Sequence, residues 1–280
     1  MYIRPRTLPP GWYPDTRREI EAMLSSWSRT DKSVSEMASS AALAPHAGWY
    51  YSGRIAWSAW QSAAEADLVV IIGGHLPGSA HFLYYAVDAF DTPLGRVSAA
   101  KEIVGNIAAR LGAIQDTRAD NTVEVHLPMA ASRFPGIPLA CFRAPNGGQA
   151  AELGNLLAEY GSQHGVSMFV LGSTDLTHYG PAYGFEPGGS GSQGLSWAHH
   201  ADDSIVSAFV AMDSRKALEL ANSQASACSV GAAIATMAFA KAQGAVSSHL
   251  LMRGSSDEMN PGADSAVGYV AIGYAQPATG

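Results

Sequence analysis

The sequence is poor in cysteine and in clustered positive charge. Only Cys141 and Cys228 occur among 280 residues, too few for a disulfide framework. Lysine and arginine number 17 against 24 acidic residues, which gives a formal net charge of −7 at pH 7, and no basic run occurs. Nucleic-acid binding requires clustered cations that neutralise phosphates, so we expect no nucleic-acid partner. The acidic balance also argues against binding to anionic membranes.

Long apolar segments are also missing. No run of about 18 residues is free of polar interruption, so we expect no membrane-spanning helix. The opening segment MYIRPRTLPPGWYPDTRREIEAML lacks the apolar core of a signal peptide. We therefore expect a cytoplasmic protein with reduced thiols, and the composition leaves homo-oligomerisation open.

Several common motifs are absent as well. The sequence contains no H-E-x-x-H or C-x-x-C metal signature and no G-x-S-x-G elbow, which disfavours a serine hydrolase. The segment IIGGHLPG follows a strand pattern, but it is neither G-x-G-x-x-G nor a P-loop. We therefore predict no nucleotide cofactor.

What is present is an alternation of strand and helix patterns without an internal repeat. This alternation predicts one α/β domain over residues 1–280, with a central, mostly parallel or mixed sheet flanked by helices. The strongest strand pattern is the β-branched run DLVVIIGG. We expect strands within 40–45, 67–74, 81–90, 137–143, 166–180 and 266–275, helices over 15–27, 53–64, 101–113, 197–212 and 229–243, and an irregular segment over 181–196.

Polar side chains follow several of these strands. His46, His75, Asp175 and His178 all come where a strand pattern ends. Ligands of open α/β sheets bind outside the carboxyl ends of the strands, so these four side chains are candidates for one shared site.

A metal site is one interpretation of this pattern. Two imidazoles and one anionic ligand, with positions left open, suit a redox or Lewis-acid metal. His46 and His75 supply the nitrogens, and Glu124, Asp175 or Cys228 could supply the anion. Cys228 precedes an apolar helical pattern, where the helix dipole favours the thiolate, although an isolated cysteine is more often a small buried apolar residue.

Two further acid–imidazole pairs are candidates for supporting roles. Glu124 and His126 lie two residues apart and share a face if DNTVEVHLP is extended, so the carboxylate could orient the ring; the alternative is a surface ion pair. Asp175 and His178 could form an acid/base pair, or simply a turn with an Asx-type hydrogen bond.

The segments PPGWYPDTRREIEAML, APHAGWYYSG, IIGGH, DNTVEVHLP, STDLTHYG, ACSVGAAI and DSAVGYVAIGY occur in this order across the chain. With them the sequence resembles the Memo family, which is similar in fold to the class III extradiol dioxygenases. The resemblance implies metal ligands at His46, His75 and Cys228. It also implies an acid/base role for His178 beside Asp175, and it places His126 in the pocket wall or behind a ligand.

The sequence departs from the family pattern at three places. Gly73-Gly74-His75-Leu76 stands where G-P-S-H-H is common, and Asp120-Asn121 replaces a glutamate–histidine pair. Ser229, and not glycine, follows the cysteine. The proposed ligands are kept, whereas the polarity of the pocket is expected to differ.

The resemblance implies a mononuclear non-haem metal site, with Fe(II) as the first choice and copper as the second, and dioxygenase-like chemistry on a small diol. We expect Trp49, Tyr50 and Tyr179 to wall the cavity and the glycine-rich segment 184–195 to cover it. The alternatives are a non-catalytic module that binds a peptide or phosphoryl group in the same cleft, and a metal-independent hydrolase with Cys228 as nucleophile.

Overall fold

The apolar run from Leu68 to Gly73 forms strand β3 in the middle of the main sheet of the computed structural model, which describes residues 1–30 and 37–275. Its side chains alternate between two apolar cores, with Val70 and Ile72 in one and Val69 and Ile71 in the other. Both faces of the strand are therefore covered, which is why its sequence shows no polar alternation.

The main sheet is mixed. Among the described residues it has nine strands in the order β10-β12-β2-β9-β3-β8-β4-β7, with β11 paired to β12. The central strands β2, β9, β3 and β8 are parallel, and β12 runs antiparallel to β2. A smaller sheet has the order β1-β5-β6. The strands are β1 Ile3–Arg4, β2 Ala41–Ala44, β3 Leu68–Gly73, β4 Leu83–Tyr84, β5 Ala89–Thr92, β6 Gly95–Ser98, β7 Ile114–Gln115, β8 Leu139–Arg143, β9 Met168–Ser173, β10 His178–Tyr179, β11 Ser247–Ser255 and β12 Ala266–Ala275.

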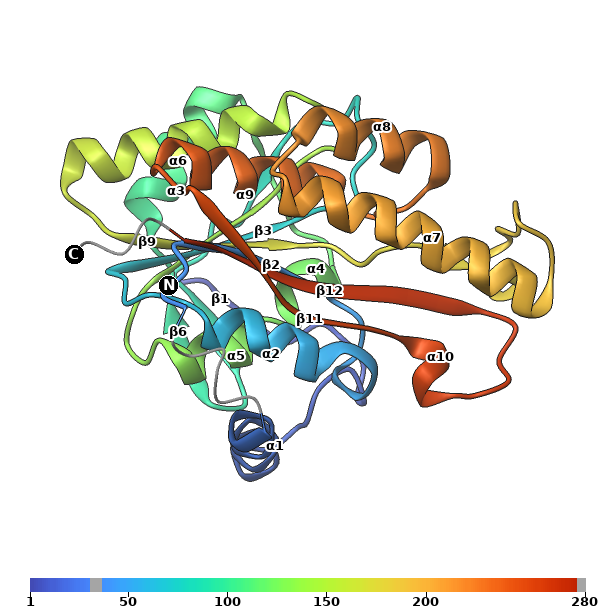
Figure 1. The fold of residues 1–280 in the computed structure, drawn as a ribbon. Helices are drawn as coiled ribbons and strands as arrows, with labels where there is room; N and C mark the ends of the chain where they lie inside the picture. Colours follow the sequence, from blue (N-terminus) through green and yellow to red (C-terminus); the bar gives the residue numbers. More distant parts are fainter. Residues whose placement is uncertain (31–36, 276–280) are drawn as a thin grey trace.

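Helices cover both faces of this sheet. Figure 1 shows α6, α7, α8 and α9 on one side and α1, α2 and α5 on the other. The helices are α1 Arg17–Thr30, α2 Arg54–Gln61, α3 Lys101–Leu111, α4 Asn121–Glu124, α5 Leu127–Arg133, α6 Ala150–His164, α7 Gly191–Val210, α8 Ser214–Gln224, α9 Val230–Ala242 and α10 Ser256–Met259, with a π-helical turn η2 over Trp49–Gly53 and a 3₁₀ turn η3 over Pro181–Tyr183. The predicted α/β architecture with a mixed, helix-flanked sheet is confirmed.

Two expected elements differ from the structure. Residues 81–90 are not one strand, because β4 pairs with β8 in the main sheet whereas β5 joins the smaller sheet. The segment 181–196 is not irregular throughout, since α7 already begins at Gly191. A Cβ atom at Gly194 would lie 2.0 Å from the carbonyl oxygen of Gly189, so this glycine permits close packing inside a helix. Strand β11 and helices α6 and α8 are not among the elements expected from the sequence.

Within residues 1–30 and 37–275, no helix combines the length and the apolar character needed to cross a bilayer.

Candidate metal centre

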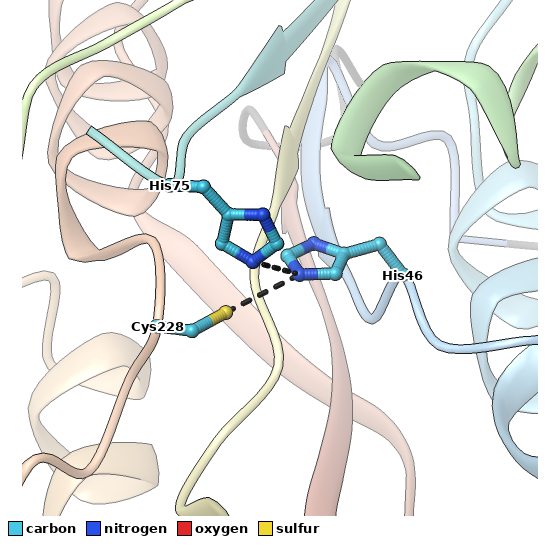
Figure 2. A group of neighbouring side chains, drawn as sticks. All are labelled: His46, His75 and Cys228. Atoms are coloured by element: carbon cyan, nitrogen blue, oxygen red, sulfur yellow. Dashed lines mark hydrogen bonds between the residues drawn. The ribbon is translucent and has the colours of Figure 1, made fainter. Parts of the chain in front are cut away.

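Three side chains from distant segments meet at the carboxyl edge of the parallel strands. His46 follows β2, His75 follows β3, and Cys228 lies two residues before the start of α9. The Nε2 atoms of the two histidines are 3.1 Å apart, and the sulfur of Cys228 lies 3.3 Å from Nε2 of His46. All three ligand atoms lie within 4.8 Å of one another, and Figure 2 shows them pointing to a common centre.

This spacing suits a metal ion. Bond lengths of about 2.0–2.3 Å at tetrahedral angles place donor atoms about 3.3–3.8 Å apart, so small side-chain shifts would fit an ion between them. Nitrogen and thiolate donors are the set that zinc, copper and iron accept. The geometry therefore fits a mononuclear site, and it agrees with the ligand set that the family resemblance implies.

Asp175 connects two of the three side chains. Its Oδ1 accepts a hydrogen bond of 2.7 Å from the backbone N–H of His46, and its own N–H donates to the sulfur of Cys228 over 3.3 Å. The N–H of Cys228 donates in turn to the carbonyl oxygen of Asp175. The buried aspartate thus fixes the backbone of one imidazole and the position of the thiol. Its Oδ2 lies 3.7 Å from Nε2 of His46, and Asp175 is not part of the group of three ligand atoms.

The outer nitrogen of each imidazole also has a partner. Nδ1 of His75 lies 3.5 Å from Oδ2 of Asp120, and this oxygen lies 2.9 Å from the guanidinium of buried Arg143. Nδ1 of His46 lies 2.9 Å from the hydroxyl of Ser173, which also contacts Nε2 of His126 at 3.1 Å. Such partners fix the orientation of imidazoles that bind a metal and raise their basicity.

The charges in the cluster favour a thiolate. Burial alone would raise the pKa of Cys228, but the charge of His46 and hydrogen bonds from His46 and His75 lower it well below its usual value. Burial opposes a charged His75, yet hydrogen bonds with Asp120 and Cys228 raise its pKa to about 10. A thiolate beside positively charged imidazoles is an arrangement in which a divalent metal ion can replace the protons.

His126 is kept neutral behind this cluster. Burial, and then the charge of His46, lower the pKa of His126 to about 3. Its Nδ1 accepts a hydrogen bond of 3.4 Å from the indole of Trp60. His126 therefore lies behind His46, with the hydroxyl of Ser173 between the two rings, and it is not among the residues that line the cavity described below.

A cavity of about 640 Å³ opens on the cluster. Imidazoles and Asp175 line its inner end, and aromatic rings line much of the rest. The lining residues are Pro10, Gly11, Trp12, His46, Ala47, Gly48, Tyr50, Tyr51, His75, Asn121, Asp175, His178, Tyr183, Ser256, Asn260, Ala263, Ser265, Val267 and Tyr269. Nε2 of His178 lies 3.6 Å from Oδ2 of Asp175, so this pair meets at the cavity.

Two expectations about the cavity are wrong. Trp49 and Tyr179 do not line it. The indole of Trp49 donates to the carbonyl oxygen of Val125, and the hydroxyl of Tyr179 donates to the carbonyl oxygen of Gly189. The segment 184–195 contributes no residue to the lining, and its role as a cover stays a prediction. The lining instead includes the N-terminal residues 10–12 and residues of the segment 256–265.

Glu124 is not paired with His126. The segment 120–128 is helical and not extended, because the Asp120 carboxylate caps α4 by accepting from the N–H of Thr122, and Pro128 lies in the first turn of α5. The two side chains therefore point in different directions. The buried Glu124 accepts hydrogen bonds from the N–H groups of Thr7 and Leu8, at 2.8 and 2.9 Å, and it holds the N-terminal segment.

We expect Glu124→Gln to lower the free energy of unfolding by about 2 kcal/mol, because an amide replaces one carboxylate oxygen with a donor that faces N–H groups. Urea denaturation measures this loss. Residues 7–13, which lead into the cavity wall, should also become more sensitive to limited proteolysis. Glu186→Gln, at an exposed position, is the control. Equal stability of both variants would contradict the anchoring role.

Residue chemistry alone does not identify the residues that hold His46 and His75 in place, which are Asp120, Asn121, Ser173 and Ser229. Asn121 donates from Nδ2 to the carbonyl oxygen of His46, and the Ser229 hydroxyl accepts from the N–H of His75. Asp120, Asn121 and Ser229 are departures from the family pattern, and this departure is the one signal in the sequence that points to these three positions.

The fold and this cluster together define an α/β protein with a candidate metal-binding site at the carboxyl edge of a mixed sheet. The family model described as Memo-like protein matches residues 4–273, and the chain belongs to the Memo family.

Similar proteins support this assignment. A MEMO1 family protein of Methanosarcina barkeri is 28% identical, over 82% of this chain and 84% of that protein. A MEMO1 family protein of Nitrosopumilus maritimus is also 28% identical, over 97% of this chain and 99% of that protein. A crystal structure described as an uncharacterized protein from Escherichia coli K12 matches with a TM-score of 0.51 and 13% identity, covering 83% of this chain and 99% of that one. At that identity the likeness concerns the fold alone.

Proposed function

We propose that this protein binds a single metal ion, Fe(II) or alternatively copper, through His46, His75 and Cys228 and oxidises a small aromatic diol. The observation that carries the proposal is the meeting of three ligand atoms within 4.8 Å, beside a cavity of about 640 Å³ that His46 and His75 line. Three protein ligands leave coordination positions free, as catalytic metal sites require.

When bound, the metal would supply a Lewis acid for the diol and a site at which dioxygen reacts. The chain itself supplies the proton acceptor. His178 faces the cavity, and its Nε2 has no hydrogen-bond partner within the described residues. Burial opposes protonation of His178, but the carboxylate of Asp175, 3.6 Å from Nε2, raises its pKa. A basic imidazole, oriented by a carboxylate, is suited to take the proton of a diol hydroxyl.

Cavity aromatics would hold the ring of the substrate and exclude water. Trp12, Tyr50 and Tyr183 line the cavity, and the ring of Tyr183 lies 5.1 Å from that of His178. Offset or edge-to-face contacts with such rings would orient a flat aromatic substrate over the cluster.

Anaerobic loading with Fe(II), followed by oxygen-uptake measurements against a panel of catechols, tests the proposal. We expect His178→Gln to slow uptake about 10²–10⁴-fold without changing iron content, because the variant cannot accept the proton. His81→Gln, at an exposed position outside the cavity lining, is the matched control. Unchanged uptake in His178→Gln would contradict its role. If the protein binds iron but consumes no oxygen with any diol, the proposed oxidation is wrong and a binding module is favoured.

A further inference from the structure

The wall of the cavity contrasts in charge with its inner end. Among the described residues, its lining includes neither lysine nor arginine. The imidazoles of the lining belong to His46, His75 and His178, and they lie at its inner end beside the carboxylate of Asp175. A substituent that points away from the metal centre would therefore meet no cationic partner in this lining.

Aromatic rings make up much of that wall. Trp12, Tyr50, Tyr51, Tyr183 and Tyr269 all contribute to the lining. The faces of such rings attract cations and stack on uncharged rings, whereas they offer little to an anion. Tyr50 and Tyr51 meet edge to face, with ring centroids 4.9 Å apart, and both side chains are partly exposed.

The outer wall adds uncharged side chains. The segment 256–265, SDEMNPGADS, supplies Ser256, Asn260, Ala263 and Ser265 to the lining and contains no lysine or arginine. It carries Asp257, Glu258 and Asp264, and of these Asp257 lies 3.4 Å from Nε2 of His199. These three carboxylates are not part of the lining, and an anion that enters the cavity would lose hydration without gaining a cationic partner there.

We propose that this cavity selects its substrate by the charge of the ring substituent, accepting diols with an uncharged or cationic substituent and rejecting carboxylated or phosphorylated ones. This inference rests on the proposed function, because it assumes that the diol end binds at the metal centre. The lack of lysine and arginine in the lining also favours a diol over a phosphoryl group as the ligand. A phosphoryl site normally supplies arginine, lysine or a cluster of backbone N–H groups.

Binding of three diols that share one ring tests the proposal: catechol, dopamine and 3,4-dihydroxybenzoate. The protein is loaded with Zn(II), which does not turn over, and dissociation constants are measured by calorimetry and by tryptophan fluorescence. We expect catechol and dopamine to bind at least about tenfold more tightly than 3,4-dihydroxybenzoate. Equal or tighter binding of the carboxylated diol would overturn the charge selection and leave the diol function intact. Binding of none of the three would overturn both.

Asn260 allows a test by gain of affinity. It lines the cavity at an exposed position. We expect Asn260→Lys to strengthen binding of 3,4-dihydroxybenzoate about tenfold and to weaken binding of dopamine, because the new cation faces the substituent. Asn260→Gln keeps the side chain neutral and should leave the order of affinities unchanged. An unchanged order in Asn260→Lys would contradict the placement of the substituent against this wall.

Discussion

Cys228→Ser is expected to abolish stoichiometric metal binding. The serine hydroxyl is a poor anion at neutral pH, so the variant loses the one thiolate of the cluster and keeps two imidazoles. Removal of a partner behind a ligand typically costs 10–100-fold in metal affinity, and removal of a ligand should cost more than about 100-fold. Metal content per chain after loading with Fe(II) or Cu, and competition with a chelator of known affinity, measure this effect.

The second cysteine provides the matched control. Cys141 lies in β8 and is buried in an apolar core, where burial raises the pKa of its thiol. Cys141→Ala should keep wild-type metal content, with at most a small loss of stability. Retention of stoichiometric metal with unchanged affinity in Cys228→Ser would refute the thiolate as a ligand. Thermal unfolding with and without metal shows whether the variant still folds, because bound metal should raise the melting temperature of the wild type alone.

The general architecture follows from the sequence because its signals are local. The β-branched run ending at Gly73 is buried on both faces, and such a run needs no tertiary information to be recognised as a central strand. The placement of His46 and His75 after parallel strands follows from the rule that these strands end at one edge. Their meeting point could therefore be predicted, although the distance between them could not.

The partners of Cys228 were beyond what the residue pattern could establish. Its position before an apolar helix permits both a thiolate and a buried apolar residue, and the choice depends on which side chains the fold brings near. The family resemblance favoured the ligand role. The structure places the sulfur 3.3 Å from Nε2 of His46 and makes Asp175 its neighbour through two backbone contacts.

The errors have identifiable physical causes. Glu124 and His126 are two residues apart, and a shared face holds only for extended backbone, whereas the Asp120 cap and Pro128 favour helix at this point. The glycine-rich composition of 184–195 predicts irregular backbone, yet α7 begins at Gly191 and Gly194 permits tight packing against Tyr179, whose Cε1 atom lies 2.7 Å from where a Cβ would stand. Short-range composition does not distinguish a glycine needed for motion from one needed for contact.

The pair Gly74 and Ser229 should show strong energetic coupling. A Cβ atom at position 74 would lie 2.3 Å from Cβ and 2.4 Å from Oγ of Ser229, far inside contact distance. Ser229 in turn accepts a hydrogen bond from the N–H of His75, whose backbone is in the left-handed region with φ of 56°. Glycine before the histidine and serine after the cysteine therefore fit together, and both positions are departures from the family pattern.

We expect Gly74→Ala to lower the free energy of unfolding by about 1–3 kcal/mol through overpacking, and to weaken metal binding because His75 is displaced. Adding Ser229→Gly to Gly74→Ala should restore much of the stability, since glycine removes both clashing atoms, at the cost of about 1 kcal/mol for the lost hydrogen bond. Adding Ser229→Ala should not, because its Cβ remains. Urea denaturation of the wild type, the single variants and the two double variants measures the coupling. If the two double variants were equally stable, contact between positions 74 and 229 could not be what places His75 at the metal centre.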